Sequence, residues 1–158
     1  MEPSRRLSRQ GHRVLQLGVA LLLFTSFEGF AIEHFAAPSL GRSAHTLSAL
    51  SGVLLLTMGL LWPRLVLGAT ASRVAFWCLV YSDLAIIAAF LLAAVWGAGN
   101  TVMPLAAGAA HGSSFQETAI AAIAYSSAPT GIISFALILW GLRTPASAAS
   151  DRSKERTT

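Results

Sequence analysis

The sequence predicts an all-α integral membrane protein, a four-helix bundle that forms one domain over residues 1–143. Apolar residues make up 54% of the 158 residues and charged residues only 11%, whereas a soluble domain usually carries about 25% charged residues. The apolar residues also fall into four long runs. A chain this short cannot bury so much apolar surface in its own core, so membrane lipid must surround most of its length.

Four segments have the roughly 20 mostly apolar residues that a membrane span needs. Each should be a helix, because an isolated strand would leave its backbone polar groups unpaired in hydrocarbon. The first segment contains one charged residue, Glu28, the third contains Asp83, and the other two contain none. The predicted spans are residues 14–32, 44–63, 74–97 and 118–142.

The two ends of the chain need separate interpretations. The basic N-terminal stretch and the apolar run after it could be read as a signal peptide. No small-residue cleavage site ends that run, and Glu28, Glu33 and His34 stand where the site would be. We therefore expect a retained first span. Residues 144–158 are polar and small, and we expect a disordered tail there.

The basic residues predict the topology. Ten of the eleven Lys and Arg residues precede the first span, lie between the second and third spans, or follow the fourth; only Arg42 does not. The positive-inside rule then places both termini in the cytoplasm, with the protein in the inner (cytoplasmic) membrane. The net charge of +4 does not indicate nucleic-acid binding, because these residues form no continuous basic face. The single cysteine, Cys78, excludes a disulfide framework within the chain.

Two acidic side chains fall inside predicted spans. A charge there costs about 2.5 to 3.5 kcal/mol on insertion scales, and such residues usually face the bundle interior. Asp83 lies about ten residues into its span, roughly 15 Å deep and near the bilayer midplane. It could handle a proton or accept a hydrogen bond from a ligand, or serve only in packing. Glu28 lies in the outer part of its span, where it could line a ligand site or simply reach water.

His45 begins the second span and is followed on its own helix face by small residues only, Ser48, Ala49 and Gly52. Small residues at this spacing allow close helix packing. They would also clear a wall for a flat ligand such as haem, with the imidazole bound to its iron. No second histidine lies within a span, so a five-coordinate iron is expected rather than a bis-histidine site. The chain has no Walker loop, GxSxG, HExxH or dinucleotide fingerprint.

The segment from Ser43 through His45 to Leu65 resembles the second helix of two related small membrane enzymes, hydroxylaminobenzene mutase and styrene oxide isomerase. The similarity covers most of the chain from Arg5 to Arg143 and is most specific over His45–Pro63. Four further stretches look more like the mutase branch: Trp96–Gly99, Met103–Pro104, Gln116–Glu117 and Leu139–Arg143.

This resemblance implies a four-helix protein that forms homotrimers. In the isomerase branch a histidine that matches His45 holds haem b, whose ferric iron acts as a Lewis acid on the epoxide oxygen. Ser48 and Gly52 would then lie beside the haem. An asparagine of that branch is replaced by Ser51, which becomes a catalytic candidate, and a substrate-positioning tyrosine is replaced by Phe90. Both departures favour the mutase activity over epoxide isomerisation.

The resemblance therefore implies a haem-dependent isomerase that rearranges a small aromatic substrate, an aryl hydroxylamine, to an aminophenol. Asp83 would stabilise positive charge or move a proton. Ile87 and Phe90 lie on or beside the helix face of Asp83 and would form an apolar substrate slot, with Glu28 as a further pocket residue. The alternatives are an epoxide isomerase, a non-catalytic haem protein, and a haem-free scaffold or transport subunit.

Overall fold

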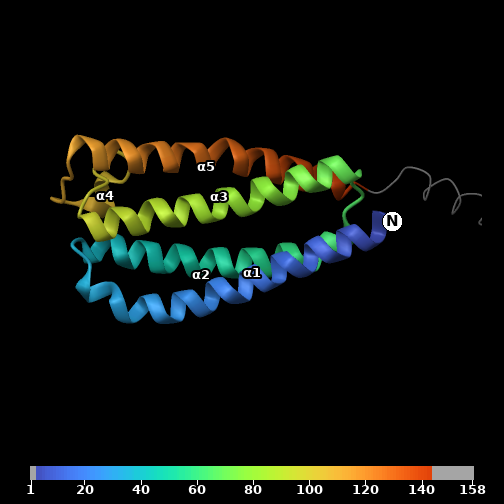
Figure 1. The fold of residues 1–158 in the computed structure, drawn as a ribbon, viewed down its shortest axis with the longest axis horizontal. Coiled ribbons are helices and arrows are strands. Elements are labelled where there is room, and N and C mark those ends of the chain that lie inside the picture. Colours follow the sequence, from blue (N-terminus) through green and yellow to red (C-terminus); the bar gives the residue numbers. More distant parts are fainter. Residues whose placement is uncertain (1–2, 144–158) are drawn as a thin grey trace, which may run out of the picture.

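The computed structural model describes residues 3–143 and confirms the all-helical fold, with four helices that could span a membrane. The long helices are α1 (Pro3–Ala31), α2 (Pro38–Leu61), α3 (Ala69–Trp96) and α5 (Ser114–Gly141). Each contains a stretch long and apolar enough to cross a membrane. The start of α1 and the end of α5 lie at the same end of the bundle (Figure 1). The side of the membrane on which this end lies stays a prediction.

Three short elements lie in the connections between the long helices: η1 (Ile32–His34), η2 (Trp62–Arg64) and α4 (Pro104–Ala107). The second long helix begins at Pro38, well before the predicted start at residue 44. A proline in the first helical turn explains the difference, because its ring fixes a helical φ and its missing N–H would have no partner there. The tail predicted for residues 144–158 lies outside the described residues.

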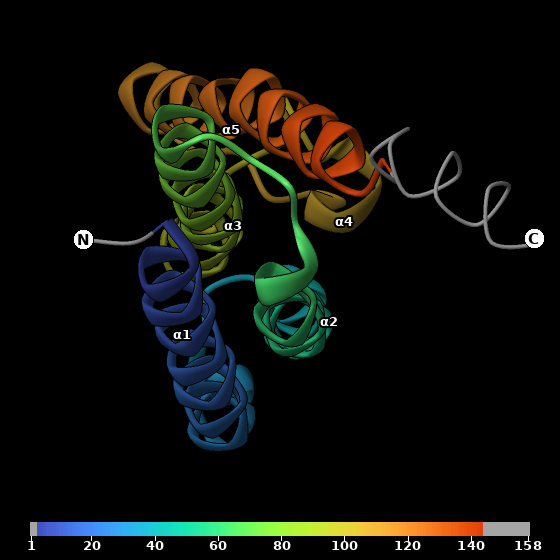
Figure 2. The ribbon, with the colours of Figure 1, turned by 90° about the vertical axis from the view of Figure 1, so that its right-hand side faces the viewer.

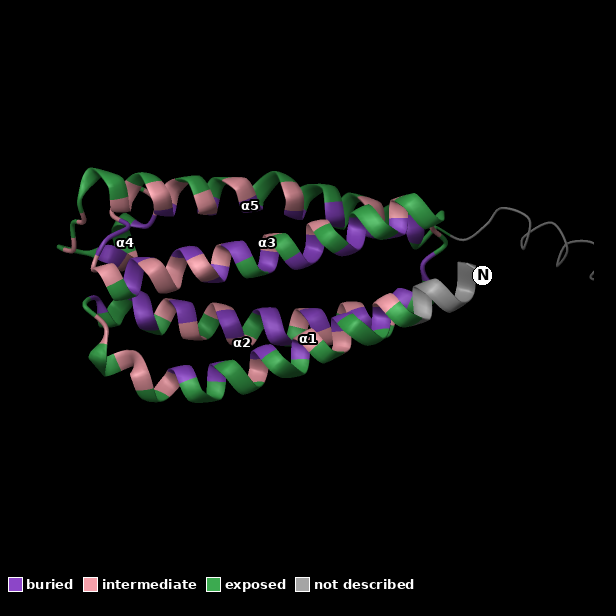
Figure 3. Cartoon of the chain, in the orientation of Figure 1, coloured by how far each residue is buried: buried purple, intermediate pink, exposed green. Residues whose placement is uncertain are grey.

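The long helices form two antiparallel pairs. Helix α1 packs mainly on α2, and α3 packs mainly on α5. Helix α2 joins the pairs by contacting α3, whereas α1 and α3 approach each other much less. In Figure 2, α3 lies beside α5, and α1 and α2 make up the opposite half of the bundle. Buried residues line the surfaces between helices, and the outward surfaces are largely exposed and apolar, as lipid contact requires (Figure 3).

Glycines bring α1 and α2 into backbone contact. Gly11 on α1 faces Gly59 on α2, and Gly18 on α1 faces Gly52 on α2. The two glycines of each helix are seven residues apart in the sequence, so they lie on the same face of that helix. A Cβ atom on Gly18 would lie 2.9 Å from the carbonyl oxygen of Gly52, which leaves no room for a side chain. This line of contacts, here called the glycine seam, fixes the register of the two helices.

Hydroxyl groups join α3 to α5. Ser82 donates to the carbonyl oxygen of Ser127 (2.9 Å), and Ser134 donates to that of Ala75 (3.0 Å). The Tyr81 hydroxyl also bonds to Ser126 (2.7 Å). These bonds satisfy polar groups that could find no water at membrane depth.

The connection between α3 and α5 is organised by Glu117. Its carboxylate accepts hydrogen bonds from the backbone N–H groups of Gly99 (2.8 Å), Asn100 (3.3 Å), Thr101 (3.0 Å) and Gly112 (3.1 Å). One acidic residue therefore holds both ends of this segment. The connection is compact, and no pattern in the sequence predicts four backbone hydrogen bonds to one side chain.

Two tryptophans near predicted span ends differ in their surroundings. Trp140 is 60% exposed and lies 4.4 Å from the Arg143 guanidinium carbon, as an interfacial aromatic residue should. Trp62 is fully buried, and its indole N–H donates to Gln10 (3.3 Å). Its place at the end of the span predicted for residues 44–63 would suggest an interfacial position, but α1 extends far enough to cover it.

Candidate functional site

Three predicted site residues gather between α1 and α2. Glu28 on α1 is 4% exposed, and its polar neighbours are Ser48 and His45 on α2. We call these three side chains the Glu28–His45 cluster. The alternative that Glu28 reaches water is not what the structure shows, because the opposing helix covers its carboxylate.

The imidazole of His45 is half-buried and lies against α1. A Cβ atom built on Gly29 would lie 3.2 Å from its Cε1 atom and 3.7 Å from its Nδ1 atom. Gly29 therefore leaves the space that the ring occupies. The sequence reasoning missed this residue, although it directly follows Glu28.

The open surface of small side chains that was expected beside His45 is only partly present. Ser48 is fully buried within the cluster. Gly52, in contrast, belongs to the glycine seam: a Cβ atom there would lie 2.7 Å from the Leu22 side chain and 3.3 Å from the carbonyl oxygen of Gly18. Within this chain Gly52 serves helix packing, the other explanation that its spacing allowed.

A second polar pair joins α2 to α3. The Ser51 hydroxyl donates to Oδ1 of Asp83 (3.0 Å), and both residues are buried. The second oxygen of Asp83, Oδ2, is buried without a hydrogen-bond partner. Ser51 lies six residues beyond His45, roughly 9 Å along the helix at 1.5 Å per residue. The pair is therefore deeper in the bundle than the cluster.

In the part of the chain that the structure describes, buried side-chain atoms without a hydrogen-bond partner occur only at these two places. Among the described residues, the buried side-chain oxygen and nitrogen atoms that lack a partner belong to four residues only. The residues are Glu28, His45, Ser48 and Asp83. Folded proteins pair nearly all such atoms, and leaving one unpaired costs about 1–3 kcal/mol. The unpaired atoms therefore lie at the Glu28–His45 cluster and at Asp83.

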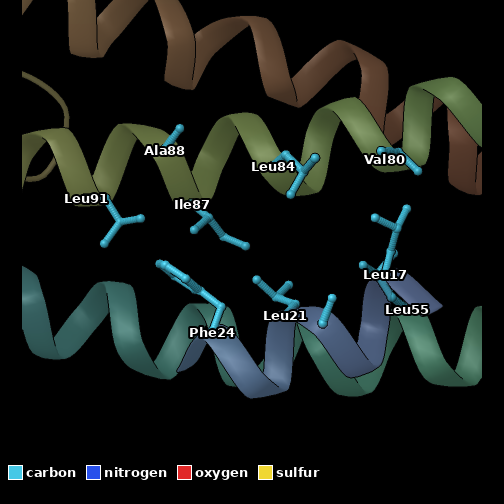
Figure 4. A pocket seen from close by; sticks show the side chains of 10 residues that line it. Leu17, Leu21, Phe24, Leu55, Val80, Leu84, Ile87, Ala88 and Leu91 are labelled. Carbon is cyan, nitrogen blue, oxygen red and sulfur yellow. The ribbon is translucent and has the colours of Figure 1, made fainter. Parts of the chain in front are cut away.

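The two apolar pocket candidates do not line one slot. Ile87 lines a cavity of about 340 Å³ between α1 and α3, shown in Figure 4 with Leu17, Leu21 and Phe24 facing it. Phe90 lines another cavity, together with Leu47 and Leu50 of α2 and with Leu105. The shared slot predicted from helix periodicity is therefore divided, because α2 packs against α3 between the two side chains.

His45 is the residue predicted to bind a metal at this site. No group of three or more His, Cys, Asp and Glu side chains in the described part of the chain is arranged to hold a metal. A single free imidazole can still ligate an iron whose other ligands come from a macrocycle. His45 is the residue that offers one.

Known proteins resemble this chain over most of its length. A family model described as styrene oxide isomerase matches residues 10–143. Hydroxylaminobenzene mutase HabB from Ectopseudomonas oleovorans is 44% identical over 132 residues, which is 84% of this chain and 80% of that protein. Hydroxylaminobenzene mutase HabA from the same organism is 30% identical over 125 residues, which is 79% of this chain and 93% of that protein. No solved structure matches significantly.

These matches confirm the resemblance that the segment around His45 suggested. They extend from the basic end of α1 to the last residues of α5, so they include both polar sites described above. The chain belongs to the styrene oxide isomerase family and is an isomerase.

Proposed function

We propose that this protein is a haem-dependent membrane isomerase that rearranges an aryl hydroxylamine to an aminophenol. The observation that carries the proposal is that, among the described residues, the unpaired buried side-chain polar atoms belong to Glu28, His45, Ser48 and Asp83. The identity of 44% to a hydroxylaminobenzene mutase supports the choice of substrate.

The residues around His45 are compatible with a haem group because the imidazole is not engaged in a hydrogen bond at Nδ1. The ring lies beside Gly29, where an added Cβ atom would be 3.2 Å from Cε1. When bound, haem b would supply a Lewis-acidic iron to the substrate oxygen. His45 would hold it, with Ser48 nearby.

Asp83 fits the proton transfers that this rearrangement needs. An aryl hydroxylamine and an aminophenol are isomers: the N–O bond breaks, a ring C–O bond forms, the ring carbon loses its proton and the nitrogen gains one. Ser51 fixes one carboxyl oxygen of Asp83 and leaves the other free. That free oxygen can take up or release the proton, or stabilise positive charge on the substrate.

Three further parts of the proposal rest on the family resemblance and on charge distribution. We propose a homotrimer, whose contacts between copies would complete the surroundings of the half-buried His45 ring. We also propose that the protein lies in the inner membrane with both termini in the cytoplasm. Mass measurement of the detergent-solubilised complex tests the oligomeric state.

The central experiment combines absorbance with product analysis. Protein expressed with added haem precursor should show a Soret band and convert hydroxylaminobenzene to an aminophenol. His45→Ala should lose both properties, while His111→Ala, which changes an exposed histidine, should keep them. A colourless wild-type protein after haem supplementation would contradict haem dependence.

Epoxide isomerisation is the second candidate, because the family model carries the name styrene oxide isomerase. The same preparation tests it with styrene oxide, whose isomerisation gives phenylacetaldehyde. Because Ser51 and Phe90 replace the residues of that branch, we expect little aldehyde. Aldehyde formation faster than aminophenol formation would reverse the order of the two candidates.

A further inference from the structure

We propose that Glu28 is a positioning residue for His45: its carboxylate accepts a hydrogen bond from Nδ1–H and thereby leaves Nε2 free to bind iron. The proposal rests on haem binding at His45. It assigns a role to a buried acid that the proposed reaction does not otherwise use.

The first argument comes from the unpaired atoms of Glu28. Both of its carboxylate oxygens are buried without a hydrogen-bond partner, and the side chain is 4% exposed. An acid inside a span is costly unless it has partners. Its polar neighbours are the Ser48 hydroxyl and the His45 ring, both from the opposing helix. No hydrogen bond joins these groups in the structure, so the proposal requires their side chains to reorient until each oxygen of Glu28 meets a donor.

The second argument comes from the two nitrogens of His45. Nδ1 is buried and unpartnered on the side of the ring that faces α1, whereas Nε2 is not among the buried unpartnered atoms. A Cβ atom added at Gly29 would lie beside Cε1 and Nδ1, so this edge of the ring faces the residue that follows Glu28. Nδ1 is therefore the nitrogen directed toward the acid, and Nε2 is the nitrogen that a ligand can reach.

The third argument is chemical. A histidine that binds a metal through one nitrogen usually donates its other N–H to a carboxylate or carbonyl oxygen, which fixes the tautomer and ring orientation. A carboxylate partner also makes the imidazole a stronger electron donor, which favours ferric over ferrous iron. Ser48 would donate to the second oxygen of Glu28 and hold the carboxylate in place. Removal of such a partner typically weakens metal binding about 10- to 100-fold.

The test compares Glu28→Gln with Glu33→Gln, which removes the same charge from an exposed position in η1. We expect Glu28→Gln to weaken haem binding, raise the iron reduction potential and lower the iron–histidine stretching frequency measured by resonance Raman spectroscopy. Glu28→Asp, which keeps the carboxylate, should restore part of each shift. The Glu33→Gln protein should match the wild type in all three measurements.

The possible results separate this proposal from the proposed function. If the wild-type protein binds no haem, both are overturned. If it binds haem and Glu28→Gln leaves the potential and the stretching frequency unchanged, only the role of Glu28 is overturned. If Glu28→Gln prevents the haem-free protein from folding, Glu28 is a packing residue and the proposal is likewise overturned.

Discussion

Asp83 shows how a single side chain in this bundle can combine two tasks. One carboxyl oxygen binds Ser51 and so links α3 to α2, while the other is buried with no partner. A residue that served packing alone would be expected to use both oxygens, because an unpaired buried oxygen lowers stability. We therefore expect the free oxygen to act on the substrate.

Asp83→Asn tests this role at the scale of the residue. The amide oxygen can still accept the bond from Ser51, so the helix contact and the Soret band should persist. Turnover should fall about 10²- to 10⁴-fold, the usual contribution of a group that transfers a proton. The measurement is the rate of aminophenol formation per haem, with Glu33→Gln as a control. Turnover equal to that of the wild type would leave Asp83 with a packing role only.

At the scale of the element, the glycine seam determines where His45 lies. Gly52 and Gly59 lie seven and fourteen residues beyond His45, so all three positions fall close to one face of α2. Because the backbones of α1 and α2 approach closely at the glycine seam, this face of α2 packs against α1. The contact between the imidazole and Gly29 follows from this register.

Gly18→Ala should destabilise the α1–α2 pair. The added Cβ would lie 2.9 Å from two backbone atoms, the oxygen of Gly52 and the nitrogen of Leu56, which cannot rotate away. Overpacking of this kind costs about 1–3 kcal/mol. We expect a lower midpoint of thermal unfolding in detergent. Gly68→Ala is the matched control, because a Cβ there has nothing within 4 Å; equal effects of the two changes would contradict the seam.

Glu117→Gln should loosen the connection between α3 and α5. The four backbone N–H groups would lose a charged acceptor, and hydrogen bonds to charged groups contribute about 1.5–3 kcal/mol each. Hydrogen exchange at Gly99, Thr101 and Gly112 should become faster, while exchange in the middle of α3 should not change. Equal exchange in the variant and the wild type would show that the segment is held by its other contacts.

At the scale of the whole molecule, the orientation in the membrane can be tested directly, because the two ends of the bundle should face opposite sides of the membrane. In a Cys78→Ala background, His111→Cys should react with a membrane-impermeant maleimide in intact cells. Gly68→Cys lies at the end of the bundle where α1 begins and α5 ends, and it should react only after lysis. The opposite pattern would reverse the orientation that the positive-inside rule predicts.

The fold was largely predictable because hydrophobic length alone defines a membrane span. The site was predictable only one residue at a time. Asp83, Glu28 and His45 stand out as polar residues in apolar runs, but periodicity cannot tell which residues of different helices meet. Phe90 and Ile87 illustrate this: both lie near the face of Asp83, yet α2 separates them. The spacing of the glycines in the first two spans was the feature of the sequence that could have indicated that Gly29 faces α2.

The cavity between α1 and α3 has a practical consequence for assays. Its walls are formed by aliphatic and aromatic side chains such as Leu17, Phe24 and Ile87, so lipid tails and detergent chains are natural competitors for the same space. For an apolar substrate that enters this cavity, the rate would depend on the mole fraction of the substrate in the micelle or bilayer. The apparent Michaelis constant expressed as an aqueous concentration would therefore change with the amount of lipid. Diluting the compound with extra lipid at constant total amount should then slow the reaction.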